Sequence, residues 1–153
     1  MKLYLIRHTQ PKNAEEDPLR PLSDEGRETM KRVSEYAARL DLPLSEIWHS
    51  RKLRAKETAA ILAESLGITH KMKECDGLSP NDEVIPVRNQ LREEKENIAI
   101  VGHLPFLLKL ASLLLCGSEE AALINFKMGS MVCLDRDNDG YWAMDWMITP
   151  DII

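Results

Sequence analysis

Residues 2–8, KLYLIRH, form the segment from which the fold is predicted. Four consecutive apolar residues at positions 3–6 show no helical period, a pattern typical of a short strand that is buried on both faces. Arg7 and His8 follow this run directly. We therefore expect a buried strand whose carboxyl end carries a guanidinium group and an imidazole.

Other segments have strand patterns as well. Five further strands are expected, at residues 46–49, 69–75, 97–101, 131–134 and 141–147. The fourth strand of the chain contains IAIV and is the most apolar, whereas residues 69–75 fit an edge strand. The last two strands flank the turn DNDG, in which Gly140 supplies a positive φ, so they are expected to form a hairpin.

Four helices are expected to alternate with these strands. Apolar residues recur every three or four positions within residues 30–40, 55–66 and 84–91, whereas the fourth helix, at residues 106–116, is strongly apolar. Ser23 and Ser50 are placed to cap the first two helices, and the polar, proline-bounded residues 11–21 predict a loop. The alternation predicts one domain over residues 1–153, a three-layer α/β/α sandwich with a mostly parallel sheet and at least one antiparallel strand.

Composition excludes several classes of protein. The chain has 20 basic and 25 acidic residues and a net charge of −5, which argues against a general binder of nucleic acid or anionic membrane. Cys75, Cys116 and Cys133 lack zinc or disulfide spacing, and the last two lie in apolar runs and are expected in the core. No apolar run has the length of a signal peptide or membrane span, so a cytoplasmic location is expected.

Polar side chains gather where three of the strands end. Ligands of an open α/β sheet bind beyond the carboxyl ends of its strands, so these side chains are expected to share one crevice. The residues concerned are Arg7, His8, Ser50, Arg54 and His103. Each taken alone is more often an ordinary surface residue, but Arg-His after one strand and Gly-His after another indicate a site. His49 and His70 have no such partners and are interpreted as structural.

Three motifs around these residues resemble those of the histidine phosphatase superfamily, also called phosphoglycerate-mutase-like. LIRHT at residues 5–9 is similar to the Arg-His-Gly signature of the family. SRKLRAKET at residues 50–58 is similar to its Ser-x-x-x-Arg-Ala-x-x-Thr segment, and VGHLP at residues 101–105 carries its second histidine. The resemblance implies a phosphoglycerate-mutase-like fold and phosphatase activity through a covalent phosphohistidine on His8. It also implies that Arg54 binds phosphate.

Shorter motifs resemble one subgroup of this family, the SixA-type phosphohistidine phosphatases. They are RPLSDEG at residues 20–26, LSPND at residues 78–82 and WMITP at residues 146–150. The chain also has no room for the insertions of the family's sugar-phosphate mutases. The resemblance implies a phosphorylated protein substrate, for example a histidine-phosphotransfer protein. One departure is Thr9, which stands where the family usually has glycine.

The chemistry of these residue types agrees with the implied roles. A neutral imidazole such as His8 is a nucleophile near pH 7 without a separate base. Arg7 and Arg54 offer planar pairs of donors for phosphoryl oxygens, and His103, if protonated, adds a third cation. Further substrate contacts are expected from Arg20, Thr9 and Ser50. No metal or other cofactor is expected, because the acidic residues show no ligand spacing.

The proton donor for the leaving group is left open by the sequence. Mutase-like relatives use a carboxylate after the third strand, and the candidates in this region are Glu74, Asp76, Asp82 and Glu83. None of them fits the acid motif of the family. Phosphohistidine does not need an enzyme acid, because its imidazole can leave already protonated, and this favours a phosphohistidine phosphatase. A small-metabolite phosphomonoesterase is the alternative. A non-catalytic phosphate-binding module is disfavoured because it has no need of a nucleophile.

Overall fold

The strand formed by the first apolar run, β1 (Lys2–Arg7), lies in the interior of the sheet. It pairs in parallel with β4 (Ile98–Gly102) on one side and antiparallel with β5 (Met131–Arg136) on the other. Residues 3–6 are each at most 1% exposed. A central position with partners on both sides explains why this strand is apolar throughout rather than alternating.

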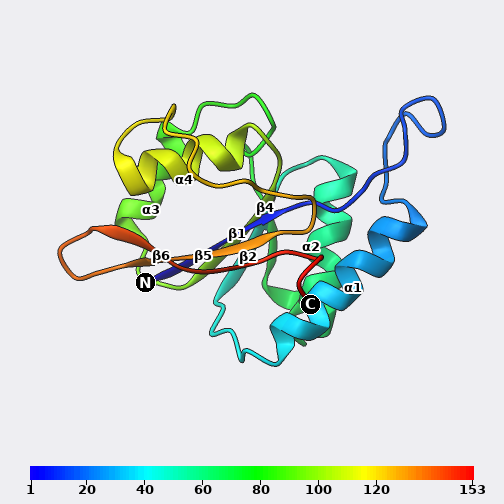
Figure 1. Cartoon of the computed structure of the whole chain (residues 1–153), viewed down its shortest axis with the longest axis horizontal. Helices are drawn as coiled ribbons and strands as arrows, with labels where there is room; N and C mark the ends of the chain where they lie inside the picture. Colours follow the sequence, from blue (N-terminus) through cyan, green and yellow to red (C-terminus); the bar gives the residue numbers. More distant parts are fainter.

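The computed structural model describes all 153 residues, and six strands form one sheet in the order β3-β2-β4-β1-β5-β6 (Figure 1). The remaining strands are β2 (Glu46–His49), β3 (Met72–Glu74) and β6 (Trp142–Ile148). Strands β1 to β4 run parallel to one another, whereas β5 is antiparallel to both of its neighbours. The predicted mostly parallel sheet and its terminal antiparallel hairpin are therefore confirmed.

Two helices cover each face of the sheet (Figure 1). They are α1 (Asp24–Ala38), α2 (Leu53–Ser65), α3 (Ile85–Glu93) and α4 (Phe106–Cys116). Side chains of β1 alternate between the two layers: Leu3 and Leu5 pack with α3 and α4, and Tyr4 and Ile6 pack with α1 and α2. The expected three-layer α/β/α arrangement is thus present.

Four local expectations are wrong. The edge strand at residues 69–75 shortens to β3 because a 3-10 helix, Thr69–Lys71, takes up its first residues. Ser50 does not cap α2: the helix begins after Lys52, and the Ser50 hydroxyl contacts a histidine instead. Leu40 lies beyond the end of α1 and is exposed. Cys116 is also exposed, because it is the last residue of α4 before the left-handed Gly117, whereas Cys133 is buried as predicted.

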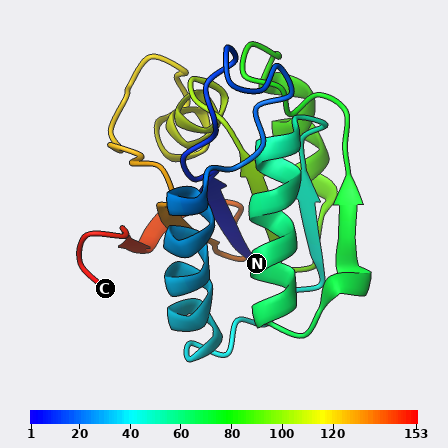
Figure 2. The ribbon, with the colours of Figure 1, turned by 90° about the vertical axis from the view of Figure 1, so that its right-hand side faces the viewer.

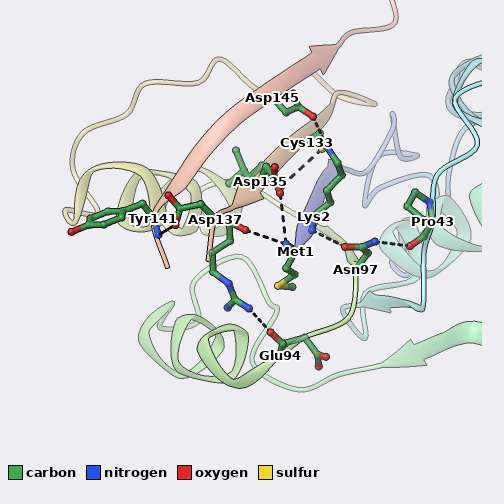
Figure 3. A network of polar contacts seen from close by, with 12 residues as sticks. Met1, Lys2, Pro43, Glu94, Asn97, Cys133, Asp135, Asp137, Tyr141 and Asp145 are labelled. Atoms are coloured by element: carbon green, nitrogen blue, oxygen red, sulfur yellow. Dashed lines mark hydrogen bonds and ion pairs between the residues drawn. The ribbon is translucent and has the colours of Figure 1, made fainter. Parts of the chain in front are cut away.

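A polar network fixes the amino end of β1 at the edge opposite the strand carboxyl ends (Figure 3). The backbone N–H of Lys2 donates to Oδ1 of Asn97 at 2.7 Å, and Nδ2 of Asn97 donates to the carbonyl of Pro43 at 3.0 Å. The Lys2 ammonium group donates to Asp145 of β6 at 2.5 Å. These bonds tie β1 to β6, to the residue before β4 and to the segment before β2. None of the four helices has the length and apolar character needed to cross a membrane.

Candidate active site

The predicted site residues at the ends of β1 and β4 are neighbours in the structure. Arg7 pairs with Gly102 in the parallel ladder, and the backbone N–H of His8 donates to the Gly102 carbonyl at 3.0 Å. The residues that follow, His8 and His103, therefore lie side by side with ring centroids 5.0 Å apart. Both imidazoles are buried, at 8% and 1% exposure.

The ring of His8 is held in one orientation by the backbone of the next residue. Its Nδ1 lies 2.7 Å from the carbonyl oxygen of Thr9. A carbonyl only accepts hydrogen bonds, so Nδ1 carries the proton and Nε2 keeps its lone pair. Burial, followed by the charges of Arg54 and Arg7, lowers the pKa of His8 to about 4. The imidazole is therefore neutral near pH 7, with Nε2 available to an electrophile.

The second imidazole is held by a residue of the neighbouring strand end. Nε2 of His103 lies 2.5 Å from Oγ of Ser50, and Nδ1 is buried without a hydrogen-bond partner. Burial, followed by the nearby His8 and Arg54, lowers the pKa of His103 to about 3. His103 is thus neutral near pH 7 rather than cationic, although a bound phosphoryl dianion favours its protonated form.

Three guanidinium groups face the same edge of the sheet. Arg7 donates from Nη1 to the Phe126 carbonyl at 2.7 Å, while its Nε is buried without a partner. Arg54, in the first turn of α2, forms no ion pair. Burial lowers the pKa of Arg7, and burial followed by the charge of Arg20 lowers the pKa of Arg54. Cations that are desolvated without a counter-charge form a site suited to an anion such as phosphate.

Thr9 contributes its backbone rather than an exposed side chain. It is fully buried, and its N–H donates to Oγ1 of Thr58 at 3.4 Å. The Thr58 hydroxyl in turn donates to the carbonyl of Arg54 at 2.7 Å. The methyl group of Thr9 faces Gly129, where an added Cβ would lie 3.0 Å from Cγ2 of Thr9. The threonine that replaces the usual glycine is accommodated by the absence of a side chain at position 129.

The loop that carries Arg20 rises over the carboxyl end of β1, above α1 and α2 (Figure 2). Arg20 has a positive φ of 49° and donates from Nε to the Lys12 carbonyl at 3.2 Å. Glu57 of α2 anchors the end of the loop, because it accepts from the N–H of Leu22 at 2.7 Å and pairs with Arg27 at 2.5 Å. Arg20 is thereby brought close enough for its charge to act on His8 and Arg54.

The sequence assigned no role to Glu57, or to Thr58 beyond its place at the end of the Ser-x-x-x-Arg-Ala-x-x-Thr motif. They follow Arg54 by three and four residues, which places all three on one face of a helix. That spacing is the signal that identifies them as supports of the site.

The four candidate proton donors form none of the contacts of the site described above. Asp76 and Glu74 are exposed and pair with Arg51 at 2.6 and 3.8 Å. Asp82 accepts from the N–H of Ser79 at 2.8 Å within its own turn, and Glu83 is exposed. None of them hydrogen-bonds to either imidazole of the site.

The two remaining histidines lie outside the anion site, as the sequence suggested. His49 is buried with Nδ1 3.0 Å from the Ser50 carbonyl, and His70 is exposed in the 3-10 helix. No group of three or more His, Cys, Asp and Glu side chains is arranged to hold a metal ion.

The profile of the histidine phosphatase superfamily (branch 1) matches residues 3–79 of this sequence. No protein with a curated description matches it significantly. Among solved structures, the protein histidine phosphatase SixA complexed with tungstate superposes with a TM-score of 0.87 at 20% identity, covering 99% of this chain and 98% of that one. This chain and SixA therefore share one fold.

Two other phosphatases have the same fold. The alpha-ribazole phosphatase from Shigella flexneri superposes with a TM-score of 0.76 at 17% identity, covering 98% of this chain and 97% of that one. A mycobacterial glucosyl-3-phosphoglycerate phosphatase gives 0.72 at 16% identity, covering 94% and 96%.

Proposed function

Because this chain belongs to the histidine phosphatase superfamily and is a phosphatase, we propose that it is a protein phosphohistidine phosphatase of SixA type that works through a covalent phosphohistidine on His8. The observation that carries the proposal is the fixed tautomer of His8. With Nδ1–H bonded to the Thr9 carbonyl, Nε2 keeps its lone pair on a ring that lies 5.0 Å from the ring of His103 and within reach of the charges of Arg54 and Arg7.

The proposed reaction has two displacements. In the first, Nε2 of His8 attacks phosphorus in line, a P–N bond forms, and the bond from phosphorus to the leaving group breaks. In the second, water attacks phosphorus, the P–N bond breaks and returns its electron pair to Nε2, and both protons of the water leave with the inorganic phosphate. Arg7 and Arg54 donate to the equatorial oxygens, whose charge must be stabilised in both steps.

The placement of the carboxylates supports phosphohistidine as the substrate. An alkoxide leaving group benefits strongly from a general acid. Here Glu74 and Asp76 pair with Arg51, and Asp82 is engaged in its own turn. The imidazole of a phosphohistidine can leave with a proton that it already carries. The near full-length likeness to a SixA structure containing tungstate, a tetrahedral oxyanion, is consistent with this choice.

The physiological partner in this proposal is a protein that carries phosphohistidine, such as a histidine-phosphotransfer protein. The proposed location is the cytoplasm, a reducing compartment in which the three free cysteines would stay reduced. A phosphomonoesterase for a small metabolite is the second candidate. It is favoured by the shared fold with the alpha-ribazole and glucosyl-3-phosphoglycerate phosphatases.

Trapping of the intermediate tests the proposal. Wild-type protein is mixed with a phosphohistidine peptide, quenched in alkali to preserve phosphoramidates, digested and analysed by mass spectrometry. We expect a phosphoryl group on His8 and no turnover by His8→Ala, while His70→Ala, at an exposed histidine, keeps full activity. Substantial turnover by a folded His8→Ala protein would sink the proposed mechanism. Hydrolysis of sugar phosphates but not of phosphohistidine would favour the second candidate.

A further inference from the structure

A cavity of about 580 Å³ opens beside the anion site, between the loop before α1 and the first turns of α2. Its charged lining is strongly unbalanced. Five cationic side chains face it, together with one carboxylate: Arg20, Arg51, Lys52, Arg54, Lys56 and Glu74. Such an excess of positive charge stands out on a chain whose net charge is −5.

Two of these cations form none of the contacts of the anion site described above and have no counter-charge. Arg20 and Arg54 belong to the anion site already described, and Arg51 pairs with Glu74 and Asp76. Lys52 and Lys56 are exposed and form no ion pair. The cavity therefore holds more positive charge than one phosphoryl group requires.

The position of these lysines is unfavourable for the helix itself. Lys52 is the N-cap of α2 and Lys56 lies in the first turns of the helix, so two positive charges stand at its start. Cations are disfavoured near a helix N-terminus, where the helix dipole is positive. The first turn of α2 has no acidic residue, whereas α1 has Asp24 and Glu25 in that position. This end of α2 therefore carries positive charge with no acidic residue of the first turn to balance it, and an anion bound here would relieve the repulsion from the helix dipole.

An exposed apolar side chain adjoins the lysines. Leu19, in the loop that carries Arg20, is 71% exposed and lines the same cavity. A small phosphorylated metabolite gains little from such a residue. A protein surface can cover it and bury its apolar area.

We propose that Lys52, Lys56 and Leu19 form a docking surface for an acidic segment of the protein substrate, with carboxylates against the lysines and an apolar side chain against Leu19. This role deepens the proposed function and rests on it. The acidic segment flanks the phosphohistidine in the substrate, since Lys52 and Lys56 line the same cavity as Arg54. Docking acts on the encounter with substrate and leaves the chemistry at His8 to the residues of the anion site.

Matched phosphohistidine peptides test the docking surface. One peptide carries glutamates and a leucine beside the phosphohistidine, and its partner carries glutamines and a serine. We expect wild type to favour the acidic peptide by about tenfold in kcat/KM, and this preference to shrink at about 1 M salt, where the screening length is about 3 Å. Lys56→Glu is expected to abolish the preference and Leu19→Ser to reduce it, while kcat/KM for an aryl phosphate stays unchanged.

The matched control is Lys109→Glu, which reverses an exposed lysine of α4 on the other face of the sheet. This variant should keep the wild-type preference. Equal kcat/KM of wild type for the two peptides, or an unchanged preference in Lys56→Glu, would overturn the docking surface while leaving phosphohistidine hydrolysis intact. If phosphohistidine is not hydrolysed at all, the proposed function fails, and docking is then read from inhibition of aryl phosphate hydrolysis by the unphosphorylated acidic peptide. Inhibition that Lys56→Glu abolishes supports the surface, and absence of inhibition overturns it.

Discussion

Nε2 of His103 lies 2.5 Å from the hydroxyl oxygen of Ser50, so one strand end of the sheet holds the imidazole of another. Nδ1 of His103 has no partner, and this contact is therefore the one polar restraint on the ring. We expect Ser50→Ala to lower kcat about tenfold with little change in thermal stability, because the ring loses its orientation toward the phosphoryl group. Ser34→Ala is the control, since Ser34 is buried without a hydrogen-bond partner on α1. Wild-type kcat in Ser50→Ala would show that the contact is incidental.

Replacement of Arg54 by lysine tests whether catalysis needs the planar pair of guanidinium donors. Lysine keeps the positive charge but loses the planar pair of donors. We expect kcat/KM to fall by an amount equivalent to about 2–4 kcal/mol, similar to the loss of one preorganised donor. Arg39→Lys, at the C-cap of α1, is the matched control and should be neutral. Near-normal kcat/KM in Arg54→Lys would place Arg54 outside the phosphoryl site.

The buried histidines make stability depend on pH. Their folded pKa values, about 4 for His8 and about 3 for His103, lie below the usual 6.5, mainly because of burial. Between pH 6.5 and pH 4 the unfolded chain binds more protons, so stability is lost as the pH falls through this window. Each group contributes a slope that approaches about 1.4 kcal/mol per pH unit.

Urea unfolding at pH 7 and at pH 5.5 measures this slope, because most carboxylates remain ionised in that interval. His103→Gln should lose less stability than wild type when the pH is lowered. The exposed His70 provides the comparison, and His70→Gln should follow wild type. Identical slopes in all three proteins would show that His103 titrates normally in the folded state.

The sequence predicts those parts of the fold that depend on residues close together in the chain. The apolar runs of β1 and β4 and the DNDG turn depend on near neighbours, and all three are found where expected. The end of α4 shows the limit of such patterns. An apolar run marks a buried helix, but it does not tell which residues face the sheet, and Cys116 lies on the exposed last turn.

The site itself is only partly predictable, because the hydrogen bonds that orient its side chains join distant parts of the chain. The Ser50–His103 contact spans 53 residues, the Thr9–Thr58 bond 49, and the bond from Arg7 to the Phe126 carbonyl 119. These contacts depend on strand register and on side-chain rotamers. Motifs identify the residues proposed to bind the phosphoryl group, whereas the groups that orient them emerge only from the structure.

Gly129 tests how the threonine beside the nucleophile is accommodated. Its φ is +81°, and an added Cβ would lie 2.9 Å from Cγ of Pro150 and 3.0 Å from Cγ2 of Thr9. We expect Gly129→Ala to lower the free energy of unfolding by about 1–3 kcal/mol and to reduce kcat, because Thr9 is displaced. Gly140→Ala separates strain from crowding, since that glycine has a φ of +89° with nothing within 4 Å. It should cost about 1 kcal/mol and leave kcat unchanged. Equal effects of the two substitutions would exclude crowding at Thr9.

The dependence of the rate on the leaving group separates the two candidate functions. No carboxylate forms a hydrogen bond or ion pair with the imidazoles, and the four that follow the third strand are exposed or engaged elsewhere. Without a proton donor, the rate depends on how well the leaving group bears negative charge. Phosphohistidine should therefore be hydrolysed best, aryl phosphates with leaving-group pKa values of about 7–10 slowly, and alkyl phosphates barely at all. A plot of log kcat/KM against leaving-group pKa for a series of phosphate esters should have a steep negative slope.

Amide substitutions complete this test, one at each of Glu74, Asp76, Asp82 and Glu83. General acid catalysis contributes about 10²–10⁴-fold, so each substitution should change the phosphohistidine rate by less than about tenfold if no carboxylate donates the proton. Arg51 is the control position, since Arg51→Gln frees Glu74 and Asp76 without removing a carboxylate. A flat plot that becomes steep when one carboxylate is replaced would reveal a dedicated acid. The enzyme would then be a phosphomonoesterase for a small metabolite, because a proton donor of that strength serves an alkoxide and gives no advantage with an imidazole that leaves protonated.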